Sequence, residues 1–111
     1  MIYFNREQIS DNCIIFKAED DGNILGSCKL ILNASYAEIN SVILTEASYP
    51  VFEGLLKAAS FYAANRNCYM CRCTDENNVT FLEKMNFLKK ESYYESDIPS
   101  ILMGSCGNCN K

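Results

Sequence analysis

The sequence predicts a single α+β domain with a mixed sheet, antiparallel in its N-terminal half and parallel where a long helix joins two strands. Three observations support this fold class. The 111 residues, 49% of them hydrophobic, suffice for one globular core and are too few for two domains. Apolar and polar residues alternate in short runs, as they do in half-buried strands. One longer segment, residues 51–63, instead has apolar residues at helical spacing.

Three strands are expected in the N-terminal half, the first beginning at Cys13. Residues 13–20 (CIIFKAED) and 24–32 (ILGSCKLIL) form a hairpin around Asp21-Gly22-Asn23, which supplies positive φ angles at the turn. Residues 36–44 (YAEINSVIL) form the third strand. Strict alternation places two sets on opposite faces, Ala37, Ile39, Ser41 and Ile43 on one and Tyr36, Glu38, Asn40, Val42 and Leu44 on the other.

A long helix is expected to begin at Tyr49-Pro50, because proline is tolerated at the first helical position, and to end at residues 65–67. Its apolar stripe comprises Val51, Phe52, Leu55, Leu56, Ala58, Ala59, Tyr62 and Ala63. Residues 68–74 (CYMCRCT) are expected to be a strand. Residues 75–87 (DENNVTFLEKMNF) are expected to be a short helix, with Asp75 or Asn77 as the N-cap and Phe81, Leu82 and Met85 facing inward.

The C-terminal region is expected to contain a last strand pair, residues 89–95 (KKESYYE) and 100–106 (SILMGSC). The cysteine-containing tail, residues 104–111, completes the single domain, which spans residues 1–111.

The composition argues against several classes of function for this protein. The net charge of −4 and the lack of a basic stripe argue against a nucleic-acid partner. The absence of histidine excludes imidazole bases and histidine metal ligands. The N-terminus does not read as a signal peptide, and no apolar run is long enough for a membrane span. The seven cysteines are therefore expected to be reduced thiols in the cytoplasm.

Three segments occur in an informative order: YAEINSVIL (36–44), LLKAASFYAANRN (55–67) and DENNVTFLEKMNF (75–87). They resemble the fourth strand, the first long helix and the later "N…fYeklGF" segment of the GCN5-related N-acetyltransferase (GNAT) superfamily, which uses acetyl-CoA. The resemblance covers about residues 13–95. It implies a GNAT-like acyl-CoA N-acyltransferase fold with two main helices, and transfer of an acetyl group to a small-molecule or peptide amine.

The same resemblance implies site residues. Glu38 would be the general base, although it also fits the polar face of a half-exposed strand. The backbone of Val42, Ile43 and Leu44 would bind the pantetheine arm and polarise the thioester. The start of the long helix would meet the pyrophosphate through Val51, Phe52, Glu53 and Gly54. Asn77 would face the cofactor, unless it only caps a helix.

The family's Arg/Gln-x-x-Gly-x-Gly/Ala loop is missing, because its positions fall on Ala47, Pro50 and Phe52. Glu53 is expected to add a negative charge in the first helical turn. The general-acid tyrosine of the family falls on Leu82, and there is no room before Cys13 for the two helices that normally cover one sheet face. The alternative function is therefore an inactive binding or assembly module that does not bind acetyl-CoA and forms a homodimer through the uncovered face.

The cysteines leave several interpretations open. Cys68-x-x-Cys71 and Cys106-x-x-Cys109 together could bind zinc, but in a strand Cys68 and Cys71 would point to opposite faces. Cys106 and Cys109 could instead form a reversible disulfide. Inert thiols are favoured and no metal is expected, with Cys71 and Cys73 acting as small apolar core residues.

Overall fold

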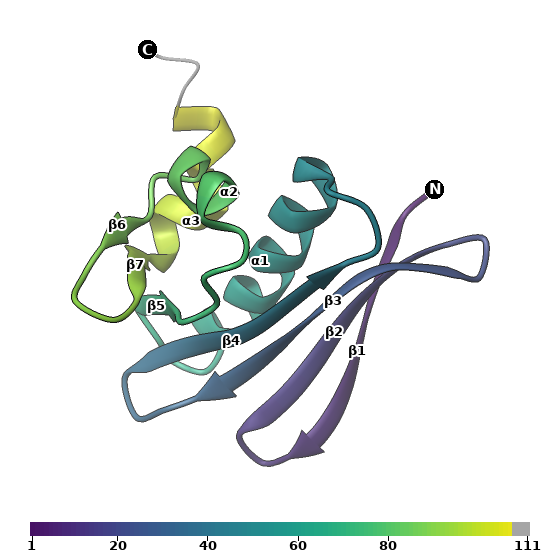
Figure 1. Ribbon diagram of the computed structural model, residues 1–111. Coiled ribbons are helices and arrows are strands. Elements are labelled where there is room, and N and C mark those ends of the chain that lie inside the picture. The colour runs from purple at the N-terminus through teal and green to yellow at the C-terminus, as the bar shows by residue number, and fades with distance from the viewer. Residues whose placement is uncertain (108–111) are drawn as a thin grey trace.

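The structure, a computed structural model, describes the backbone of residues 1–107 and the side chains of residues 1–103. Its centre is a seven-stranded sheet with the strand order β1-β2-β3-β4-β5-β7-β6 (Figure 1). Neighbouring strands are antiparallel except for β4 and β5, which are parallel. The strands are β1 (Tyr3–Ser10), β2 (Cys13–Asp20), β3 (Asn23–Leu32), β4 (Tyr36–Leu44), β5 (Met70–Cys73), β6 (Leu88–Lys89) and β7 (Tyr94–Asp97).

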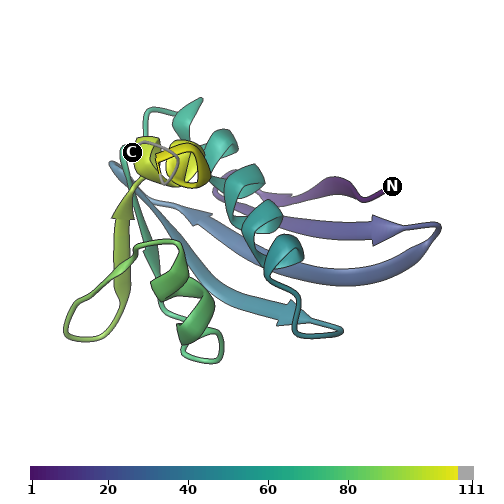
Figure 2. The same ribbon diagram turned by 90° about the horizontal axis from the view of Figure 1, so that it is seen from above.

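Three helices pack on one side of this sheet: α1 (Tyr49–Ala64), α2 (Val79–Lys84) and α3 (Ile98–Gly107). Helix α1 crosses β1 to β4 and also contacts α2 and α3 (Figure 2). The apolar stripe predicted for the long helix is confirmed, since all of its members are buried except the half-buried Ala58. The predicted α+β class with a mixed sheet is correct. No helix within residues 1–107 is long and apolar enough to cross a membrane.

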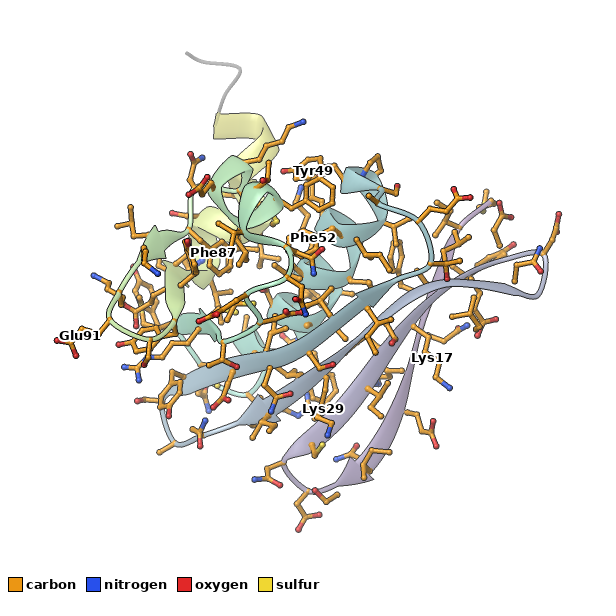
Figure 3. The ribbon with its side chains drawn as sticks, in the orientation of Figure 1. Lys17, Lys29, Tyr49, Phe52, Phe87 and Glu91 are labelled. Carbon is orange, nitrogen blue, oxygen red and sulfur yellow. The ribbon has the colours of Figure 1, made fainter. Side chains whose placement is uncertain are left out.

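The other side of the sheet is uncovered by any described helix. Lys17 and Lys29 project from it toward the viewer in Figure 3, beside half-buried Ile15 and Ile31. Buried and half-buried residues alternate along β2, because every second side chain faces the helix-covered side of the sheet and the others face the uncovered side.

Three elements differ from the sequence prediction. The expected strand at 89–95 is instead a hairpin, because residues 90–93 connect β6 to β7 and the Lys90 amide donates to the Tyr93 carbonyl at 2.7 Å. Residues 3–10 form strand β1, although none of its side chains is buried. An edge strand that gains little apolar burial leaves little hydrophobic pattern to detect. The expected strand at 100–106 is instead part of α3. Asp97 caps this helix, since its carboxylate accepts hydrogen bonds from the Ser100 amide at 2.9 Å and hydroxyl at 2.8 Å, and Pro99 follows in the first turn.

Four cysteines lie in the core as free thiols: Cys28, Cys68, Cys71 and Cys73. The prediction that Cys71 and Cys73 are core residues is confirmed. Cys68 precedes β5 and is buried as well, so the expected opposite orientation of Cys68 and Cys71 does not expose either one. Among the residues described, no cluster of cysteines and acids could hold a metal ion. The side chains of Cys106 and Cys109 lie outside the described part.

Burial raises the pKa of the Cys28 and Cys73 thiols to about 12. An unfolded chain binds fewer protons than the folded one between the ordinary thiol pKa of about 8.5 and the folded value. The stability contributed by these neutral thiols is thus complete below about pH 8.5 and is lost as the pH rises toward 12.

We expect the free energy of unfolding to fall between pH 8.5 and pH 11, by up to about 1.4 kcal/mol per pH unit for each buried thiol. Urea denaturation at a series of pH values measures this slope. Cys28→Ala should make the slope shallower, whereas Cys13→Ala, at a half-exposed position, should leave it unchanged. Parallel curves for the Cys28 variant and the parent would contradict the assignment.

Candidate functional site

Strands β4 and β5 separate partway along β4. Their parallel pairing ends at Ile39 and Cys73, followed by one hydrogen bond from the Thr74 amide to the Ile39 carbonyl at 3.0 Å. Beyond that point β4 continues with β3 alone, as far as Leu44. The strands diverge beyond this point, beside the loop that leads to α2 (Figure 1), and the region between the two diverging backbones is called the β4–β5 opening below.

A β-bulge accompanies this separation. Lys29 of β3 is opposite Ser41, but the next residue, Leu30, is opposite Ile39, so Asn40 is an extra residue in β4. The bulge reverses the alternation, and the strict pattern predicted for residues 40–44 is therefore wrong. Val42 turns into the core with 4% of its surface exposed, and Ile43 turns outward with 64% exposed.

The bulge also decides where the backbone of β4 points. The Thr45 amide donates to the Leu25 carbonyl at 3.0 Å, so the hydrogen-bonded pairs of this ladder include Ile43 and exclude Val42 and Leu44. The N–H and C=O groups of Val42 and Leu44 consequently face the opening. The GNAT resemblance assigns the backbone of Val42, Ile43 and Leu44 to the pantetheine arm. Val42 and Leu44 fit that assignment, whereas the backbone of Ile43 faces β3.

Residues from the loop after β5 bridge the opening at Val42. One carboxylate oxygen of Asp75, which is 8% exposed, lies 2.7 Å from the Val42 nitrogen, and the other lies 2.8 Å from the Asn77 nitrogen. The side-chain amide nitrogen of Asn78 donates to the Val42 carbonyl at 3.3 Å. Both polar backbone groups of Val42 thus have side-chain partners within the chain.

The start of α1 lies beside this opening. The first helical hydrogen bond runs from the Phe52 amide to the Ser48 carbonyl at 3.0 Å, and Pro50 occupies the first turn as predicted. Glu53 is not in the first turn, which contains no acid, and it pairs instead with Lys57 at 3.4 Å. The prediction that Glu53 adds a negative charge in the first helical turn is therefore wrong.

Aromatic side chains fill the space between α1 and α2. The Phe81 ring centroid lies 5.5 Å from that of Tyr49 and 5.4 Å from that of Phe52. Phe52 is fully buried, and Lys84 of α2 places its ammonium 4.4 Å from the centre of the Tyr49 ring. Figure 3 labels Tyr49 and Phe52 at this end of α1. Outside this cluster a shallow hollow of about 280 Å³ remains, lined by Ala47 and residues 76–81.

Glu38 lies on the uncovered face of the sheet, half-buried, opposite Ile31 of β3 and Arg72 of β5. Arg72 donates from Nε to Glu95 at 3.0 Å, and this hydrogen bond raises the pKa of the guanidinium. The same guanidinium lies over the ring of Tyr36 at 4.1 Å. Glu38 has no hydrogen bond or ion pair within residues 1–103, so its carboxylate is available on the open face.

The remaining predicted site residues lie apart from one another. Val51 is buried and faces Gly26 of β3, and Gly54 faces β1, where a side chain would collide with the Phe4 ring. Asn77 is exposed, and Asn78 rather than Asp75 or Asn77 occupies the N-cap of α2. The sequence pattern indicated Asp75 only as a possible helix cap and did not indicate its bond to Val42. Its position directly after a buried strand was the available signal.

Solved structures with a similar arrangement of strands and helices identify the fold of this chain. The candidate N-acetyltransferase YhhK from E. coli, bound to coenzyme A, has a TM-score of 0.67 at 17% identity, over 81% of this chain and 75% of its own. A candidate acyl-CoA N-acyltransferase from Klebsiella pneumoniae has a TM-score of 0.69 at 13% identity, over 88% of this chain and 98% of its own. This chain has the GNAT fold.

A third structure of the GNAT fold is the PaiA N-acetyltransferase of Thermoplasma acidophilum in complex with coenzyme A. Its TM-score is 0.64 at 22% identity, over 78% of this chain and 61% of its own. No protein-family model and no curated protein matches the sequence. At these identities the likeness establishes the fold, and the chemistry has to be argued from the residues.

We expect Asp75→Ala to destabilise the GNAT fold by about 2–3 kcal/mol. The substitution leaves the buried Val42 N–H without its acceptor and removes two hydrogen bonds to a charged group. Urea denaturation measures the change, and Glu76→Ala, at an exposed neighbouring position, is the matched control with an expected effect within about 0.5 kcal/mol. Equal stability of the two variants would show that Asp75 does not hold the opening together.

Proposed function

We propose that this protein transfers an acetyl group from acetyl-CoA to an amine across the opening between β4 and β5. The observation that carries the proposal is the bulge at Asn40, which aims the backbone of Val42 and Leu44 into that opening. A thioester placed there would meet the Leu44 N–H, and the Val42 N–H once Asp75 is displaced. Such main-chain donors stabilise the developing oxyanion without any special side chain. Glu38 precedes the bulge by two residues on the accessible face.

The proposed reaction is direct transfer. The amine nitrogen attacks the thioester carbonyl, the C–S bond breaks, and the amine proton passes to Glu38 directly or through a water. Solvent protonates the departing thiolate, because the buried Leu82 stands where the resemblance would place a tyrosine. No covalent enzyme intermediate is required, so the absence of histidine is no obstacle.

Cofactor binding would differ from the usual glycine-rich grip. No lysine or arginine occurs between Thr45 and Gly54, but Lys84 of α2 brings an ammonium to Tyr49 at the start of α1. We assign Lys84 the role of neutralising the pyrophosphate, with the hollow at Ala47 and residues 76–81 as the entrance for the pantetheine arm. The acceptor would approach from the uncovered face, which suits a small-molecule or peptide amine.

The second candidate function is a binding or assembly module that does not bind acetyl-CoA. The packing of Tyr49 and Phe52 against Phe81 favours it, because these rings fill the space between α1 and α2. The bond from Val42 to Asp75 favours it as well, since a cofactor would have to displace that carboxylate. In this function the uncovered sheet face would join two copies of the chain.

Titration calorimetry with acetyl-CoA separates the two functions. Under the first, we expect saturable binding and, at a hundred times the dissociation constant, a stabilisation of about 2.7 kcal/mol, seen as a rise in melting temperature. Lys84→Gln should weaken binding several-fold and more so at low salt, while Lys90→Gln, on the β6–β7 loop, should not. Absence of binding at millimolar acetyl-CoA would refute the acetyltransferase function and leave the second.

Glu38→Gln tests the base independently of binding. We expect acetyl transfer to an amine panel to fall by about 10²–10⁴-fold, with the affinity for acetyl-CoA retained. Glu46→Gln, an exposed residue in the loop before α1, is the control. If the Glu38 variant keeps the parent rate across the whole pH range, another group accepts the proton.

A further inference from the structure

We propose that a cleft between β1 and the C-terminal end of α1 is a second binding site, specific for a small organic anion with a flat apolar body, such as an aromatic carboxylate. The cleft has a volume of about 410 Å³, and its lining includes Asn5, Arg6, Phe61, Tyr62, Asn65 and Arg66. It lies at the opposite end of α1 from the β4–β5 opening, so the proposal does not depend on acetyl transfer.

Two arginines converge in this cleft on one aromatic ring. The guanidinium carbon of Arg66 lies 3.6 Å from the centre of the Tyr62 ring, and that of Arg6 lies 5.1 Å from it. Neither arginine has a carboxylate within 4.0 Å among residues 1–103. In a chain with 14 acids and 10 basic residues, two neighbouring cations without an acidic partner form a local anion-attracting site.

The position of Arg6 follows from the register of β1. Arg6 is opposite Phe16 of β2, and therefore shares the inner face with Phe4 and Gln8. Helix α1 buries Phe16, whereas every side chain of β1 stays exposed although α1 also contacts this strand. The uncovered strip of inner face beside α1 is the cleft.

Tyr62 is a fixed platform for the arginines. Its hydroxyl donates to Gln8 Oε1 at 3.3 Å, and its ring packs edge-to-face on Phe16 with centroids 5.8 Å apart. Arg66 also donates to the Tyr62 carbonyl at 3.5 Å. A guanidinium held over a ring face still has further N–H donors that can bind a carboxylate.

The end of α1 does not cancel this attraction. A helix C-terminus is negative because its last carbonyls lack partners, but here the chain caps them itself. The amides of Asn65, Arg66 and Asn67 donate to the carbonyls of Phe61, Ala63 and Ala64 at 3.2, 2.9 and 3.1 Å. The negative end is therefore largely satisfied before any ligand enters.

The rim of the cleft indicates a flat organic ligand rather than a bare inorganic anion. Phe61 is 61% exposed and Phe4 is 39% exposed, and both rings line the cleft. A benzoate-like ligand would cover apolar surface on these rings while its carboxylate meets Arg6 and Arg66. The side-chain amide of Asn65, which also lines the cleft, supplies a further donor for the carboxylate oxygens.

An NMR titration of the full chain tests the site with three probes: benzoate, its neutral isostere benzamide, and inorganic phosphate. We expect benzoate to shift the resonances of the Tyr62 ring and of the Arg6 and Arg66 Nε–H groups, and to bind at least five-fold more tightly than benzamide or phosphate. Arg66→Gln and Arg6→Gln should each weaken benzoate binding by at least five-fold. Arg72→Gln, which removes an arginine from the other sheet face, should leave it unchanged.

Each contrary result overturns a definite part of the proposal. Equal affinity for benzoate and benzamide would refute charge recognition, and equal affinity for benzoate and phosphate would refute the role of the aromatic rim. Parent-like binding by both arginine variants would refute the site itself. Melting temperatures of the variants, measured alongside, show whether weaker binding reflects loss of a contact or loss of the fold.

Discussion

The hydrogen bond between the Asp75 carboxylate and the Val42 amide is the interaction on which the rest of this molecule depends. Strands β4 and β5 stop pairing after Ile39, and a sheet that opens at its middle would leave backbone groups without partners. Asp75 and Asn78 supply those partners from the following loop. They hold the end of β5 and the start of α2 against β4, and thereby fix the position of α2 beside α1.

The same bond also bears on function, because it occupies a backbone group that a bound thioester would use. The bulge at Asn40 creates the backbone geometry that a thioester needs, and Asp75 occupies one of the groups thus presented. A ligand that competes for the Val42 amide must also offer that carboxylate a new partner or let it reach water. Binding energy from Lys84 and the hollow at α2 would have to exceed that cost. Acetyl transfer requires that the cofactor's binding free energy exceed the cost of displacing Asp75 from the Val42 amide, and the binding-module function requires that it does not.

The sequence predicted those parts of the fold that bury a periodic apolar surface. Helix α1 could be found because its stripe meets the sheet along the whole helix, and the hairpin of β2 and β3 because every second residue is buried. Strand β1 was missed because backbone pairing holds it and no side chain of it is buried. Helix α3 was mistaken for a strand, although Asp97-Ile98-Pro99-Ser100 is a recognisable helix start.

The site was harder to predict than the fold, because its central feature is an insertion of one residue. A period-two pattern carries no mark of a bulge at a polar residue such as Asn40, yet that bulge decides which of Val42 and Ile43 is buried. Convergence of Arg6 and Arg66 on Tyr62 was equally hidden, since residues from a strand edge and a helix end meet only after β1 has paired. In both places a backbone register, which the side chains specify only weakly, brings the chemically active groups together.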